Sequence, residues 1–372
     1  MNESLDGVHY GSFCTAAGAA CAGPPAVASP DEGIPGNIVV DNQPPNQGDP
    51  FVHRVYAIHT SGKGDAVIVS YCSGAQGDDT AAKIANSCTD PSQVAPGDPG
   101  HVNMYWHDSY VRKPGRYGTG YLFAAIAIDH SGNLYAVWAE YPSATNGGSA
   151  NGPGVVKLSV SKDGAKTWSD PINVSPAKLG NNVMPWIVAG DAGRVDIVWY
   201  GAPQAKENGK YGPDTLDHGT WNVYMAQSLN ALASKPTFKV TKVSDHQNKF
   251  GNISTQGLGG SPDRSLGDFM QVHAGRKGQA IISYVDDTSA DRNPDFCGGC
   301  GQTPAEAAGP IMIAEQNRGP SLFKSVGTVH GRKRAVGHSR DRKGDAAFYG
   351  GGTSVDAGAN LDLRGASIKM AT

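Results

Sequence analysis

The chain has 372 residues, with 50 glycines, 24 prolines and a formal net charge of −3 at pH 7. This charge excludes a global basic field for nucleic acid, and no run of about 18 apolar residues indicates a membrane span. Abundant glycine and proline, with valine, isoleucine, tyrosine and threonine in short runs, predict an all-β fold of many strands joined by turns. No long segment has apolar residues at helical spacing.

The first residues, Met1 to Ser4, contain no apolar signal region, and a strand-like run follows over residues 7–13. Six cysteines occur as three local pairs, which an exported chain would use as disulfides. For the last pair, the CxxC spacing also fits a zinc or redox site. We therefore interpret the chain as an extracellular or periplasmic protein, a mature form or a fragment, with these disulfides: Cys14–Cys21, Cys72–Cys88 and Cys297–Cys300.

Four segments share one pattern, in which an apolar strand, a polar turn with glycine and a second apolar strand follow one another. Such self-similarity indicates repeated units, and antiparallel sheets of four strands are the blades of β-propellers. We expect each hairpin to supply the two inner strands of a blade. We also expect a propeller over residues 1–350, and a closing strand or the start of another domain over 351–372. The four segments are Arg54–Ser73, Leu122–Tyr141, Met184–Ala202 and Phe269–Thr288, with turn glycines Gly64, Gly132, Gly193 and Gly278.

A polar turn between two further extended runs reads Ser-Lys-Asp-Gly-Ala-Lys-Thr-Trp over residues 161–168. The aspartate can accept hydrogen bonds from its own turn, and the tryptophan can fold back over it. The stretch resembles the Asp-box (BNR repeat) of the sialidase-type β-propellers, with Ala165 where that family has glycine. Degenerate copies are expected at Ser228–Ala231 and Glu315–Arg318. The matching residues are Ser161, Asp163, Gly164, Thr167 and Trp168.

The resemblance implies a six-bladed propeller, with five or six blades of four antiparallel strands present here. It also implies a secreted protein that acts on glycans. Sialidases use three arginines for the substrate carboxylate, a tyrosine nucleophile with a glutamate partner, and an aspartate acid/base. The Phe/Tyr-Arg-Ile-Pro motif that carries one of those arginines is absent from this sequence. Two hypotheses follow: a sialidase-like exo-glycosidase that hydrolyses acidic glycans, or a non-catalytic propeller that binds polysaccharide or protein. A purely structural, calcium-stabilised module is a third possibility.

In the propeller geometry that we expect, one face carries the tight turns, and the other carries longer loops where a site would lie. Carboxylates, arginines and aromatics converge there, and these can transfer protons, bind an anionic group and stack on sugar rings. Asp286-Asp287 could instead be a turn or a calcium contact, and Arg264 with Asp268 could simply hold a loop. The candidate catalytic residues are Asp268, Glu140 and Tyr200, and the candidate substrate-binding residues are Arg264, Arg116, Tyr117, Asn182, Asp286 and Asp287.

No cofactor is expected beyond structural calcium, because the histidines are scattered without a metal-binding spacing. The basic cluster between Arg332 and Lys343 is interrupted by aspartates, which favours a solvated loop. The expected partner is therefore a glycan or polysaccharide, with the chain acting as a monomer or as one module of a larger secreted chain.

Overall fold

The computed structural model describes the backbone and side chains of most of the central chain. The short strands β1 (Asn2–Glu3), β2 (Gly11–Ser12) and β23 (Gly365–Lys369), and positions 72, 107 and 108, are described as backbone only. The other described residues are 34–41, 55–71, 109–115, 117–118, 123–142, 150–255, 264–267, 270–288 and 311–330.

Four sheets contain nearly all the strands, all antiparallel except for one strand of the last sheet, and we number them in chain order. Sheet 1 contains β3 (Pro35–Val40), β4 (Val55–Thr60), β5 (Val67–Cys72) and β6 (His107–Arg112). Sheet 2 contains β7 (Tyr117–Gly118), β8 (Ala125–Ile128), β9 (Leu134–Pro142), β10 (Val155–Ser161) and β11 (Ile172–Asn173).

Sheet 3 contains β12 (Asn181–Ala189), β13 (Val195–Ala202), β16 (Thr220–Ser228), β17 (Lys239–Lys242) and β18 (Lys249–Phe250). Sheet 4 contains β19 (Gln271–Ala274), β20 (Ala280–Val285), β21 (Ile311–Pro320) and β22 (Thr328–His330), with β23 parallel to β21. An insertion between β13 and β16 contains the hairpin β14 (Lys206–Glu207) and β15 (Lys210–Tyr211) and a single 3-10 turn, Pro213–Thr215.

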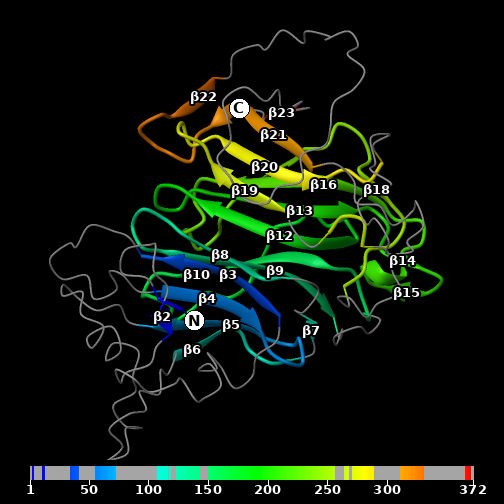
Figure 1. The fold of residues 1–372 in the computed structure, drawn as a ribbon, viewed down its shortest axis with the longest axis horizontal. Helices are drawn as coiled ribbons and strands as arrows, with labels where there is room; N and C mark the ends of the chain where they lie inside the picture. The colour runs from blue at the N-terminus through cyan, green and yellow to red at the C-terminus, as the bar shows by residue number, and fades with distance from the viewer. Residues whose placement is uncertain are drawn as a thin grey trace, which may run out of the picture.

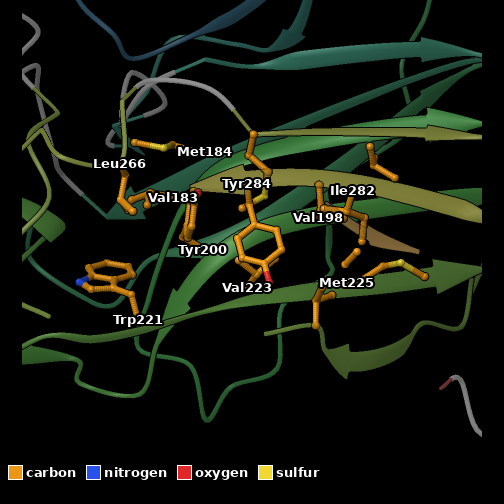
Figure 2. Close-up of a cluster of buried hydrophobic side chains, with 14 of the residues drawn as sticks. Val183, Met184, Val198, Tyr200, Trp221, Val223, Met225, Leu266, Ile282 and Tyr284 are labelled. Atoms are coloured by element: carbon orange, nitrogen blue, oxygen red, sulfur yellow. The ribbon is translucent and has the colours of Figure 1, made fainter. Parts of the chain in front are cut away.

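The four sheets stack face to face in chain order, from sheet 1 at the bottom of Figure 1 to sheet 4 at the top. Their first long strands lie next to one another, because β3 packs on β8, β8 on β12, and β12 on β19. Two clusters of buried apolar side chains fill the spaces on either side of sheet 3. The cluster between sheets 3 and 4 includes Trp221, Tyr200, Tyr284 and Met225 (Figure 2). The all-β prediction is therefore confirmed.

Three of the four predicted hairpins pair the first long strand of a sheet with the strand that follows it: β8–β9, β12–β13 and β19–β20. Their glycines take the left-handed backbone that such turns need, with φ near +79°, +79° and +65° at Gly132, Gly193 and Gly278. We call the end of the sheets that carries these turns the turn end. The opposite end, where β9, β13 and β20 finish, is the loop end.

The first hairpin is different, and the expectation that it forms the two inner strands is wrong. Gly64 joins β4 to β5, which are the second and third strands of sheet 1, because β3 precedes them. Its turn also lies at the loop end. Arg112 pairs with Val67, directly after this turn, and forms an ion pair with Glu140 at the loop end of sheet 2. The hairpin pattern identifies an antiparallel pair, but not which pair of the sheet it is.

The turn between β10 and β11 is stabilised by its own side chains. The Ser161 hydroxyl donates to Asp163 Oδ1 at 2.8 Å and accepts from the Ala165 N–H at 3.0 Å. Asp163 also accepts from the backbone and the hydroxyl of Thr167. Burial alone would raise the pKa of Asp163, but these hydrogen bonds outweigh burial and lower it. The turn is also attached to sheet 1, because the Trp168 indole N–H donates to the Ser109 hydroxyl of β6 at 3.0 Å.

A second turn with the same bonding joins β16 to β17. Ser228 donates to Asn230 Oδ1 at 3.2 Å, and Asn230 Oδ1 accepts from the backbone and hydroxyl of Thr237, at 3.0 and 3.1 Å. In sheet 4, by contrast, the segment Glu315–Arg318 lies inside β21. The turn there begins at Ser321, whose hydroxyl accepts from the Phe323 N–H at 2.8 Å. A turn with similar side-chain hydrogen bonds therefore lies at Ser228, whereas the segment predicted as a turn at Glu315 is part of a strand.

Candidate functional site

The loop end brings several of the predicted site residues together. Tyr117, Glu140, Asn182, Tyr200, Arg264, Asp286 and Asp287 are all described there, and Arg116 and Asp268 lie outside the described residues. Most of the described members form two groups, one between sheets 1 and 2 and one between sheets 3 and 4, and Asn182 lies between sheets 2 and 3.

Glu140 is the centre of the first group and is only 4% exposed. Arg112 forms an ion pair with it, with Nε 3.0 Å from Oε2, and the Trp138 indole N–H donates to the same oxygen at 3.2 Å. Lys157 Nζ lies 3.7 Å from Oε1. Both oxygens of this carboxylate are therefore engaged, because Arg112 also donates to Oε1, at 3.4 Å.

Arg112 reaches this position because of a β-bulge. The β5–β6 register shifts between the Val67–Arg112 pair and the Ile68–Tyr110 pair, and a bulge can turn a side chain toward the other face of its sheet. The guanidinium lies 4.0 Å from the centre of the Tyr117 ring, which is 38% exposed. Lys113 is exposed beside it. We call Arg112, Lys113, Tyr117, Glu140 and Lys157 the Arg112 cluster; it contains three cations and one carboxylate.

Asn182 is fully buried between sheets 2 and 3. Its side-chain amide donates to the Gly154 and Leu179 carbonyls, at 2.8 and 3.2 Å. Its backbone N–H donates to the Tyr141 hydroxyl at 3.0 Å, and its carbonyl accepts from that hydroxyl at 2.9 Å. These contacts tie the two sheets together at the loop end.

Tyr200 is also fully buried, and its hydroxyl is bound to the next sheet. It accepts from the Val285 N–H at 2.9 Å and donates to the Val285 carbonyl at 3.4 Å. Burial raises the pKa of Tyr200, and the neighbouring charges of Asp286 and Asp287 add to this effect. The hydroxyl is therefore neutral at physiological pH and engaged in holding β13 to β20.

Asp286 and Asp287 are each 2% exposed and each has a cationic or titratable partner. Asp287 Oδ2 lies 2.9 Å from Lys249 Nζ, which also donates to Ser265 at 3.0 Å. Asp286 Oδ2 lies 2.9 Å from His246 Nε2, and its other oxygen accepts from Thr288. Arg264 is partly exposed and precedes Ser265 in the same short turn, which places it beside the Lys249–Asp287 pair.

Residues outside the two candidate lists complete these groups, among them Arg112, Lys157, His246 and Lys249. Lys157 interrupts the apolar run Val155–Val160, which is a signal that could have been used. His246 and Lys249 lie in and beside an irregular segment, where no spacing marks them. Among the described side chains, no group of three or more His, Cys, Asp and Glu is placed to hold a metal ion. Within the same residues, no helix has the length and apolar character needed to cross a membrane.

No protein-family model matches the sequence, and no curated protein matches it. Among solved structures, the intramolecular trans-sialidase from Ruminococcus gnavus is 13% identical, with 67% of this chain and 40% of that chain covered and a TM-score of 0.33. The Hadza microbial sialidase Hz136 is 11% identical, with 72% and 55% covered and a TM-score of 0.32. The polysaccharide lyase Uly1 is 9% identical, with 64% and 53% covered and a TM-score of 0.31. The chain thus spans about half the length of these structures or less, and similarity at this level carries no functional argument.

Proposed function

We propose that this chain is a β-propeller module that binds an acidic polysaccharide at the loop end without cleaving it. The observation that carries the proposal is the engagement of Tyr200 and Glu140, two of the three predicted catalytic residues; the third, Asp268, lies outside the described residues. Tyr200 bonds to the backbone of the next sheet, and Glu140 is enclosed by Arg112, Lys157 and Trp138. A nucleophile or acid/base must be free to reach the reacting atoms, and these two are not.

The propeller assignment is supported by the order of the sheets. The first strands β3, β8, β12 and β19 lie in sequence and run toward the turn end, as inner strands of successive blades would. The direction of β3 follows from Asp41, which comes directly after it and lies beside Gly132 at the turn end. The repeated Ser161 and Ser228 turns support the Asp-box assignment.

The acidic character of the ligand follows from the Arg112 cluster. Arg112 and Lys157 both contact one carboxylate there, and the exposed Lys113 follows Arg112 in the chain, so the cluster has a net positive charge. The Arg112 guanidinium is oriented by Glu140 on one side and by the Tyr117 ring on the other. A planar, fixed guanidinium suits carboxylate or sulfate groups, which it can bind through paired hydrogen bonds. The exposed part of the Tyr117 ring offers an apolar surface to a sugar ring.

A glycan array combined with turnover assays on sialosides and other acidic glycans tests this proposal. We expect salt-sensitive binding without turnover. Lys113→Gln and Tyr117→Ala should each reduce binding at least tenfold, and Lys166→Gln, an exposed lysine at the turn end, should not. The predicted site around Arg264 is tested in parallel with Arg264→Lys.

The outcomes separate the hypotheses. Hydrolysis of a sialoside would overturn the non-catalytic assignment in favour of a sialidase-like hydrolase. Binding that Arg264→Lys abolishes, and that Lys113→Gln and Tyr117→Ala leave intact, would move the ligand away from the Arg112 cluster. Absence of binding to any acidic glycan would reject the function altogether.

A further inference from the structure

The seam between sheets 3 and 4 has a titratable group at each of its two ends. At the loop end this group is His246, which is half exposed and lies between two carboxylates. Its Nε2 is 2.9 Å from buried Asp286, and its Nδ1 is 2.5 Å from Asp245. Only an imidazolium can donate from both nitrogens at once, so the bridge is complete only when His246 is protonated.

The loop-end bridge is part of a larger clasp. Segment 246–249 is bonded to segment 285–288 by backbone and side-chain contacts. The Asp287 N–H donates to the Asn248 carbonyl at 2.7 Å, Asn248 donates to the Val285 carbonyl at 3.1 Å, and Thr288 donates to the Gln247 carbonyl at 2.7 Å. The buried Lys249–Asp287 pair lies beside them. His246 therefore titrates inside the contact that joins the sheets.

At the turn end the titratable group is Asp196 of β13, which is fully buried. One oxygen accepts from the Gln227 amide at 2.9 Å, and the other has no hydrogen-bond partner among the described residues. Gln227 also donates to the Pro320 carbonyl of sheet 4, at 3.1 Å, and Gln316 donates to that same carbonyl at 3.0 Å. Asp196 thus belongs to a polar layer that links the two sheets.

The charged groups that surround each end are different. His246 faces Asp245 and Asp286. Burial raises the pKa of the nearby Tyr284, and the charges of these two carboxylates raise it further. Asp196 forms no ion pair among the described residues, since the nearby Arg194 donates instead to the Ser321 carbonyl at 3.3 Å. An ionised carboxylate in that layer would be buried without a counter-charge, which is strongly unfavourable.

We propose that the seam between sheets 3 and 4 is a pH-sensitive joint, closed when His246 and Asp196 are protonated and loosened when both have lost their protons. Each deprotonation releases one proton to solvent. The loss at His246 removes one donor of the clasp, and the loss at Asp196 leaves a bare charge in the polar layer. Opening of the seam lets water reach both groups.

The titration directions agree with this geometry. Burial of Asp196 raises its pKa to about 7, and the Gln227 hydrogen bond offsets this only in part. Burial of His246 would lower its pKa, but the bonds to Asp245 and Asp286 outweigh burial and raise it. Both folded-state values lie above those of the unfolded chain, so both groups stabilise the fold at low pH. The Asp196 contribution is lost between about pH 4 and 7, and the His246 contribution is lost as pH rises through its raised value.

The test is to measure the melting temperature from pH 4 to 9. The unsubstituted protein (the parent) is compared with Asp196→Asn, His246→Gln and the double variant. Asp170→Asn, at an exposed carboxylate, is the matched control. We expect the melting temperature of the parent to fall by several degrees over this range. Asp196→Asn should remove most of the fall below pH 7. His246→Gln should lower the melting temperature at pH 6 and leave it unchanged at pH 9.

Hydrogen–deuterium exchange locates the effect. After correction for the intrinsic pH dependence, exchange in β16 and β21 should accelerate between pH 6 and 8.5, and exchange in β9 should not. A parent-like pH dependence in both single variants, or uniform acceleration in all sheets, would overturn the proposal. If Asp196→Asn does not fold, the unsubstituted protein is labelled with carbon-13 at its aspartates, and the carboxyl groups are titrated by NMR instead. A carboxyl that titrates near pH 7 supports the joint, and titration of every aspartate below pH 5 refutes it.

Discussion

Trp138 and Trp199 occupy equivalent positions, six residues after the hairpin glycine of sheets 2 and 3. Both are fully buried, but their indole N–H groups differ. Trp138 donates to Glu140, two residues further along β9. The matching position in β13 is Gly201, and the Trp199 N–H has no partner among the described residues. A side chain cannot be added there easily, because a Cβ on Gly201 would lie 2.9 Å from the Tyr224 ring.

Substitution of each tryptophan by phenylalanine measures this difference directly. Trp138→Phe removes a charge-assisted hydrogen bond, and Trp199→Phe removes a buried donor that is already unsatisfied. Because the change in volume is the same, we expect Trp138→Phe to lower the free energy of unfolding by about 1–2 kcal/mol more than Trp199→Phe does. Urea unfolding of the two variants checks this. Equal losses would mean that the Trp199 N–H has a partner such as a buried water.

At the scale of single elements, the turn over residues 161–168 contains Ala165 at the place where the Asp-box pattern has glycine. Ala165 has a left-handed backbone, with φ of +67°, and its methyl group is fully buried. Glycine adopts this conformation without strain, which explains the glycine in the Asp-box pattern. The buried methyl group compensates for part of the strain in this chain.

Ala165→Gly should therefore leave the free energy of unfolding nearly unchanged. Relief of left-handed strain gains about 1–2 kcal/mol, and loss of the buried methyl group and added backbone freedom cost about the same. Ala136→Gly is the matched control, because Ala136 is equally buried in the same cluster but lies in the regular strand β9. Ala136→Gly should lower the free energy of unfolding by at least about 1 kcal/mol more than Ala165→Gly does, as measured by denaturant unfolding. A larger cost at Ala165 would show that the methyl contact dominates.

The hairpins show what the sequence could predict about the elements and what it could not. Local patterns located all four hairpins, because alternating apolar residues and a left-handed glycine are properties of a few adjacent residues. Whether a hairpin forms the first and second or the second and third strands of its sheet depends on a strand that is distant in sequence. Sheet 1 begins with β3, which is separated from β4 by the connection 41–54. One local sign of the difference exists, since the aromatic residue six positions after the other glycines is replaced by Ser70.

At the scale of the whole molecule, the sequence could predict which residues lie at the same end of the sheets. The prediction placed carboxylates, arginines and aromatics at one end of the sheets, because strand ends can be read from the pattern. Which of them bond to one another could not be read, since these contacts cross between sheets. The Arg112–Glu140 ion pair depends on a bulge, and the Asp286–His246 contact depends on the irregular segment 243–248. Neither contact produces a periodic pattern in the sequence.

The six cysteines provide the last prediction, which concerns the whole chain. Their side chains lie outside the described residues, and only the backbone of Cys72, at the end of β5, is placed. Because each pair is close in sequence, we expect the disulfides Cys14–Cys21, Cys72–Cys88 and Cys297–Cys300. Mass spectrometry of a non-reduced digest of protein from an oxidising compartment should find these three linked peptides. Short loops constrain the unfolded chain only modestly, so reduction should lower the melting temperature by a few degrees without unfolding the sheets. Free thiols throughout, or zinc bound at Cys297 and Cys300, would contradict both the pairing and the exported location inferred from it.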